Sequence, residues 1–176
     1  MKRILIGTLL AFLFIVSCDN NEYLENEKYF SAFINNDSFI NNIRDYKKKL
    51  KNEFTIITLD YSIRSDTNIF ELSYNIDMAP ILFYPPVHYF YLENTLIIIN
   101  TELDSFKSIS DKQLNKILKA EFPNEYEKYL RNKEIPVMTT FENEVWVIKF
   151  KNDKLVSKSV YPIAKTNINK IRHEYY

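Results

Sequence analysis

Glycine is almost missing from this chain, and its scarcity limits what the chain can fold into. The 176 residues contain a single glycine, Gly7. Phosphate-cradling loops, dinucleotide-binding turns and the sharp strand-to-helix turn of many serine hydrolases all need glycine, because the backbone must approach a ligand closely or adopt a positive φ without a Cβ clash. The sequence therefore excludes these three enzyme classes. Asparagine and aspartate must supply the left-handed turn positions.

Strand-like patterns occur in three pairs, each with two alternating apolar and polar runs joined by a short polar turn. Such pairs predict antiparallel hairpins. The run from Leu96 to Ile99 does not alternate, so we expect that strand to be central and covered on both faces. A loop containing three prolines, at positions 80, 85 and 86, separates the first two pairs. The pairs are 57–63 with 70–76, 87–92 with 95–100, and 144–150 with 155–161.

Helical spacing occurs in two regions outside these hairpins. The first, 38–52, carries apolar residues on one face and basic residues on the other. The second, 110–132, opens with Ser110 and Gln113 in the positions of a capping box, and Pro123 marks the start of a second helical piece. The predicted fold class is α+β: an antiparallel sheet of about six strands, packed with an N-terminal helix and a helical pair. The apolar face of the first helix is Phe39, Ile43, Tyr46 and Leu50.

The N-terminal segment has the layout of an export signal. Lys2 and Arg3 precede an apolar run too short for the roughly 20 residues of a spanning helix, and the run ends at Cys18, the only cysteine. Ile15-Val16-Ser17-Cys18 resembles the lipobox of bacterial lipoproteins, with isoleucine in place of the usual leucine. That resemblance implies cleavage before Cys18, a diacylglycerol on its thiol and a fatty acyl group such as palmitate on its amine. Two or more acyl chains would anchor the protein stably in a membrane.

The chain accordingly divides into three parts. We expect a signal peptide over 1–17, a lipidated Cys18 with a flexible acidic tether over 18–30, and one globular α+β domain over 31–176. Acidic residues after a lipidated cysteine are compatible with retention in the inner membrane or with export outward. We expect an exported protein anchored in the cell envelope at the outer membrane, with exposure at the cell surface left open.

Charge and histidine content narrow the choice of partners. The chain has 23 basic and 23 acidic residues, and removal of residues 1–17 takes away Lys2 and Arg3. The mature protein is therefore near neutral, which argues against nucleic acid as a partner. His88 and His173 are the only histidines, so no metal-binding spacing can be written, and we expect neither metal nor cofactor.

The aromatic and proline-rich segment 83–91 is the best candidate for recognition. Tyrosines beside rigid prolines can form a contact surface of low conformational entropy. The candidate binding residues are Tyr84, His88, Tyr89 and Tyr91. An alternative is that Tyr89 and Tyr91 lie on one face of a strand and His88 and Phe90 on the other, with one set packed in the core.

Two functions remain open on the sequence alone. The first is a non-catalytic binding domain whose partner is a protein, such as a toxin or an enzyme that it inhibits, or an envelope glycan. The alternative is a small envelope hydrolase that uses two carboxylates, since glycoside cleavage needs two acids about 5–9.5 Å apart and no other motif. The first is the one we expect. Candidate acids for the alternative are Glu71, Asp77, Glu93, Glu102 and Asp104.

Overall fold

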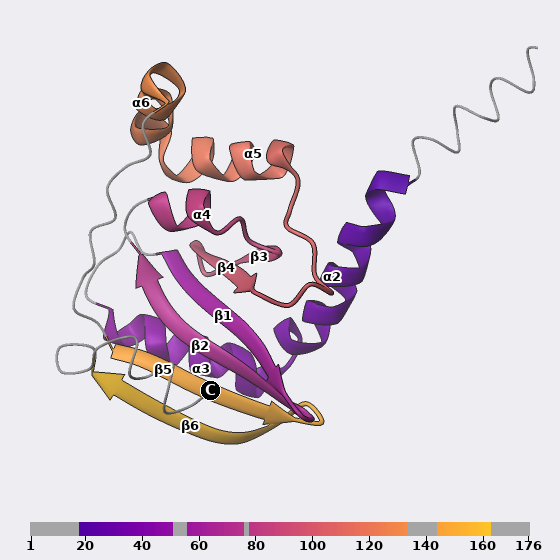
Figure 1. The fold of residues 1–176 in the computed structure, drawn as a ribbon. Helices are drawn as coiled ribbons and strands as arrows, with labels where there is room; N and C mark the ends of the chain where they lie inside the picture. The colour runs from indigo at the N-terminus through magenta and orange to yellow at the C-terminus, as the bar shows by residue number, and fades with distance from the viewer. Residues whose placement is uncertain (1–17, 51–55, 76–77, 134–143, 163–176) are drawn as a thin grey trace, which may run out of the picture.

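The described part of the chain folds into a six-stranded sheet with helices on both faces (Figure 1). The computed structural model describes residues 18–50, 56–75, 78–133 and 144–162, without the side chains of 18–24, Pro80 and Pro162. The predicted signal peptide, His173, Asp77 and the segments around them lie outside these residues. The predicted α+β class is confirmed. In chain order the elements are α2 (Cys18–Ile34), α3 (Asp37–Lys49), β1 (Ile56–Arg64), β2 (Thr67–Asn75), α4 (Ala79–Phe83), β3 (His88–Leu92), β4 (Thr95–Thr101), α5 (Asp111–Glu121), α6 (Pro123–Asn132), β5 (Glu144–Lys151) and β6 (Lys154–Pro162).

All three predicted hairpins form, and they lie side by side in the order β3-β4-β1-β2-β5-β6. The pairs β1–β2, β3–β4 and β5–β6 are antiparallel, as is the contact between β2 and β5. The predicted sheet was wholly antiparallel, but β1 and β4 run parallel, with Ile57 opposite Ile97. Strands β1 and β4 are separated in the chain by β2, α4 and β3, so no turn joins them directly. Their parallel pairing therefore depends on contacts between distant segments and not on a local turn.

The tight turns show how the domain folds without glycine. The β3–β4 turn places Glu93 and Asn94 at φ 51° and 63°, and the β5–β6 turn places Asn152 and Asp153 at 48° and 59°. Two consecutive residues with positive φ are typical of the two-residue turn that matches the twist of a hairpin. Ser65 has φ 53° in the β1–β2 turn. Asparagine and aspartate thus supply three of these five left-handed positions, as the sequence predicts.

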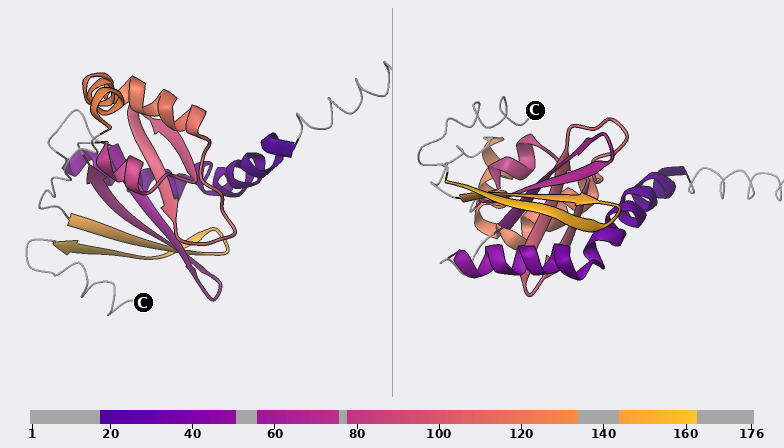
Figure 2. Two further views of the ribbon diagram at one scale, coloured as in Figure 1. Left: turned by 45° about the horizontal axis from the view of Figure 1, so that its top comes forward. Right: turned by 90° about the horizontal axis from the view of Figure 1, so that it is seen from below.

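Strand β4 divides the core into two clusters. Ile97 and Ile99 face α2 and α3 on one side of the sheet, while Leu96 and Ile98 face α4, α5 and α6 on the other. All four side chains are at most 1% exposed. The predicted central strand is therefore confirmed. Figure 2 shows α3 lying along one side of the sheet.

Helix boundaries follow local capping signals. Helix α3 begins one residue earlier than predicted, because the side chain of Asn36 accepts hydrogen bonds from the next turn and caps it. The capping box of Ser110 and Gln113 opens α5 as predicted, and Pro123 is the first residue of α6. A short helix, α4, occupies part of the expected proline loop.

The flexible tether predicted for 18–30 is wrong at its C-terminal end, because residues 26–30 lie in α2 and pack into the domain. Asn26 is 3% exposed and Phe30 is fully buried. The Asn26 amide donates to the carbonyl oxygens of Val87 at 3.0 Å and Lys107 at 2.7 Å. A buried polar side chain is stable when hydrogen bonds replace its water. The domain therefore starts before the predicted boundary at residue 31.

Candidate functional site

The predicted binding segment is only partly exposed. Tyr84 and Tyr91 are 63% and 52% exposed, and the neighbouring Phe83 is 50% exposed. Tyr89 packs against the cluster beneath α4, α5 and α6. His88 is only 5% exposed. Two of the four predicted residues therefore lie on the surface, and the alternative of a partly packed segment is the one observed.

His88 is a core residue. Its ring stacks on Phe30 of α2, with centroids 5.8 Å apart and planes 17° from parallel. Burial lowers the pKa of His88, and the charge of Glu27 opposes that shift. The neutral imidazole is therefore favoured, and the ring serves to pack α2 onto β3.

The backbone under the exposed aromatic residues is fixed by the following loop. The amide of Ile109 donates to the carbonyl of Pro86 at 2.8 Å, and the Ser108 hydroxyl donates to the carbonyl of Pro85 at 3.3 Å. Tyr84 therefore projects from a backbone with few alternative conformations.

Tyr91, at the edge of the sheet, is tied to the helical layer. Its hydroxyl donates to Oε1 of Glu121 at 2.9 Å. Partial burial, with this bond, raises the pKa of Tyr91 to about 12. The ring is thus held in one place while about half of the side chain stays exposed.

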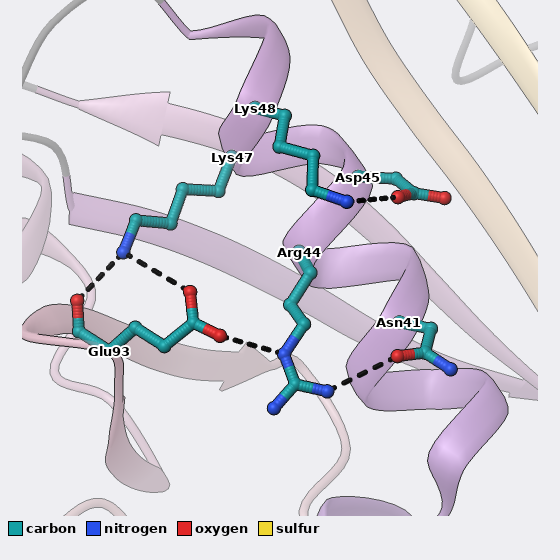
Figure 3. Close-up of polar contacts among 6 residues, drawn as sticks. All are labelled: Asn41, Arg44, Asp45, Lys47, Lys48 and Glu93. Atoms are coloured by element: carbon teal, nitrogen blue, oxygen red, sulfur yellow. Dashed lines mark hydrogen bonds and ion pairs between the residues drawn. The ribbon is translucent and has the colours of Figure 1, made fainter.

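The basic face of α3 contacts acidic residues of the protein itself (Figure 3). Arg44 Nε lies 2.8 Å from Oε1 of Glu93, and Lys47 donates to the Glu93 carbonyl at 2.7 Å. Lys48 pairs with Asp45 at 3.3 Å. The Arg44 hydrogen bond holds the pKa of Glu93 below its usual range. Glu93, one of the five candidate catalytic acids, therefore links α3 to the β3–β4 turn.

The sheet brings another candidate acid beside a second carboxylate. Glu71 of β2 lies directly opposite Asp60 of β1. Side chains opposite one another on antiparallel strands have Cβ atoms about 4.5–5.5 Å apart. Asn100 of β4 also donates to Asp60, at 3.4 Å. Glu102 and Asp104 are exposed in the loop that follows β4.

A groove of about 570 Å³ lies where the tips of two hairpins meet α2. No sequence pattern predicts this groove, because it joins segments that are far apart in the chain. Figure 1 shows the β1–β2 and β5–β6 tips converging near the end of α2. The lining residues are Glu25, Lys28, Tyr29, Ala32 and Phe33 of α2, Asp66 and Asn68 of the first tip, and Asn152 and Asp153 of the second.

Hydrogen bonds hold the groove's walls together. The hydroxyls of Tyr29 and Tyr61 are in close contact, and they donate to Oδ1 of Asn68 at 2.9 and 2.6 Å. Burial, followed by the bond to Tyr29, raises the pKa of Tyr61 well above its usual value. The Tyr61 hydroxyl therefore stays protonated at neutral pH and keeps its hydrogen bond to Asn68.

Ion pairing and a capping side chain fix the two hairpin tips. Lys151 lies 2.6 Å from Oδ2 of Asp66. That hydrogen bond lowers the pKa of Asp66. The side-chain amide of Asn36, the residue that caps α3, donates to the carbonyl of Asp153 at 2.7 Å. The groove is therefore braced on both sides.

Comparison with protein families, characterised proteins and solved structures finds no match for this chain. Within the part of the chain that the structure describes, no helix combines the length and apolar character needed to cross a membrane. The same residues contain no group of three or more His, Cys, Asp or Glu side chains arranged to hold a metal ion.

Proposed function

We propose that this protein is a lipid-anchored protein of the bacterial cell envelope whose domain binds a protein partner without catalysis, such as a toxin or an enzyme that it inhibits. The observation that carries the binding proposal is the exposure of three large aromatic side chains from one stiffened segment. Phe83, Tyr84 and Tyr91 are each at least half exposed. Tyrosine supplies a large, rigid contact area at low entropic cost, and aromatic residues dominate the binding energy of protein interfaces.

The anchor is proposed from the lipobox at Cys18, and a helix that begins at that residue supports a short arm between the anchor and the domain. Cys18 is the first residue of α2, and Asn26 is already buried in the domain. Eight residues of helix span about 12 Å. An acylated Cys18 would therefore hold the domain close to the membrane on a helical arm. The partner we propose is one encountered at the membrane surface.

A pull-down from envelope extract tests the binding proposal. The bait is the wild-type chain, compared with Tyr84→Ala and Tyr91→Ala. Val156→Ala is a matched control, because Val156 is 60% exposed on β6, at the opposite edge of the sheet. We expect both tyrosine variants to lose a protein that the wild type and Val156→Ala retain, at least ten-fold by quantitative mass spectrometry. Equal retention by well-folded tyrosine variants would remove the aromatic segment as the binding surface.

One observation favours the alternative of a carboxylate hydrolase, namely the position of Glu71 opposite Asp60. Cβ atoms about 4.5–5.5 Å apart leave room for the two carboxyl groups to lie about 5–9.5 Å apart, as glycoside cleavage requires. The test is release of reducing sugar from envelope glycan by the purified protein. Activity that Glu71→Gln abolishes and Glu102→Gln retains would replace the binding proposal with the hydrolase.

A further inference from the structure

We propose that the groove between α2 and the two hairpin tips binds a neutral saccharide. This site shares no residue with the aromatic segment, and it depends neither on the anchor nor on a protein partner. Its volume of about 570 Å³ falls within the roughly 300–1,000 Å³ of typical small-molecule sites. That space can hold one or two sugar rings.

Charge selects an uncharged ligand. The lining includes three acids, Glu25, Asp66 and Asp153, and one base, Lys28. Asp66 is already neutralised by Lys151 at 2.6 Å. Two acids then face one base, so the excess charge is small, and a strongly charged ligand would gain little from it.

The remaining groups match a polyol. Sugar hydroxyls both donate and accept hydrogen bonds, so they suit a surface that mixes carboxylates with carboxamides. Glu25 and Asp153 supply acceptors, while Asn152 supplies both kinds of group. The side-chain oxygen of Asn68, Oδ1, accepts the hydrogen bonds of Tyr29 and Tyr61, so the donor left for a ligand is Nδ2.

One side of the groove is aromatic. Tyr29 is 36% exposed and lines the groove beside Ala32. Its orientation is fixed by an edge-on contact with Phe106, with centroids 5.1 Å apart, and by its hydroxyl bond to Asn68. An aromatic face held in this way can pack against the C–H face of a sugar ring. The walls need little rearrangement, which lowers the entropic cost of binding.

The test uses the full chain in a polyoxyethylene detergent, whose head group is not a sugar. The protein is screened on an array of immobilised neutral oligosaccharides, and the strongest ligand is then titrated in solution by calorimetry. Glu25→Ala keeps a good helix former in α2, and Asp153→Gly tolerates the left-handed φ of that turn position. We expect each variant to weaken binding at least ten-fold, with a melting temperature no lower than that of the wild type. Glu127→Ala, on α6, is the matched acid control and should bind as the wild type does.

Several results would overturn this proposal. One is that the array retains no saccharide. Another is that Glu25→Ala and Asp153→Gly bind the saccharide with the affinity of the wild type. A third is that the protein binds the polycation spermidine in place of sugars. Titration of the free oligosaccharide and of the same sugar on a lipid in vesicles then shows whether the source is soluble glycan or a glycolipid head group. The Tyr84 and Tyr91 variants should keep saccharide binding, so failure of this proposal is distinguishable from failure of the aromatic binding surface.

Discussion

Asn26 offers a direct test of whether α2 belongs to the domain. Its amide is 3% exposed and donates to two carbonyls, those of Val87 and Lys107. Asn26→Ala would leave both carbonyls without this donor. Val87 is 3% exposed, so its carbonyl would lose its partner in a buried setting, whereas Lys107 is an exposed residue that water can reach.

The size of the expected loss of stability follows from the surroundings of the Val87 and Lys107 carbonyls. An unsatisfied buried acceptor costs about 1–3 kcal/mol, and a hydrogen bond that water can replace costs about 0.5–1.5 kcal/mol. We therefore expect Asn26→Ala to lower the free energy of unfolding by about 2–4 kcal/mol. For a chain of this size, that corresponds to a fall in melting temperature of roughly 4–16 °C. Asn26→Asp should be worse at neutral pH, because a buried carboxylate would face two carbonyl oxygens.

The assay is thermal and urea unfolding followed by circular dichroism. Lys28→Ala is the control, since Lys28 lies two residues further along the same helix and is exposed. We expect this control to unfold close to the wild type. If Asn26→Ala also unfolded within 1–2 °C of the wild type, a shift below about 1 kcal/mol, α2 would not be packed as described and the flexible tether would be the better account.

Three further changes test individual elements. Burial lowers the folded-state pKa of His88 below its unfolded value of about 6.5, so the unfolded state binds more protons below that pH, and stability should be full above it and fall as the pH drops through it. Urea unfolding at about pH 7.5 and about pH 5.5 should show this loss of stability in the wild type and in His173→Gln, and a smaller loss in His88→Gln. If His88→Gln lost as much free energy of unfolding between the two pH values as the wild type, His88 would not be the group responsible. Ser110→Ala removes the capping box of α5 and should cost about 1 kcal/mol, with no effect on stability as the refuting result. Lys133 has φ 57° at the end of α6, so Lys133→Gly should stabilise by up to about 1 kcal/mol in thermal unfolding while Lys133→Ala should not, and equal effects would argue against a left-handed cap.

Local signals explain why much of the fold could be predicted from the sequence. Each hairpin combines alternation of period two with a polar turn, and the turns at Asn94 and Asn152 adopt the positive φ that asparagine tolerates. Ser110, Gln113 and Pro123 mark helix ends through their own hydrogen-bonding chemistry. These features depend on residues a few positions apart.

Features that depend on distant contacts were missed. Helix α2 reads as a polar tether because its buried face includes Asn26, which is stable inside only because Val87 and Lys107 supply acceptors. The parallel pairing of β1 with β4 depends on how two hairpins pack together, and no turn specifies it. Nonlocal pairing of this kind leaves little trace in residue spacing.

The candidate sites, too, were predicted where they depend on local sequence and missed where they depend on distant contacts. Proline and tyrosine content pointed to segment 83–91, but residue spacing did not show which of its faces is buried, and His88 proved to be in the core. The groove combines α2 with two hairpin tips, so no single stretch of sequence contains its pattern. Asp153 and Asp66 are ordinary turn acids in the sequence and become neighbours across a groove only in the fold.

We propose that lipid on Cys18 holds this domain at a membrane. The decisive measurement is intact mass spectrometry of the protein from the membrane fraction, compared with Cys18→Ser. We predict a wild-type chain that begins at Cys18 and carries diacylglycerol and a further acyl group. We predict that Cys18→Ser lacks the added mass and leaves the acylated membrane pool. The same processed mass and the same membrane association in both proteins would contradict the claim.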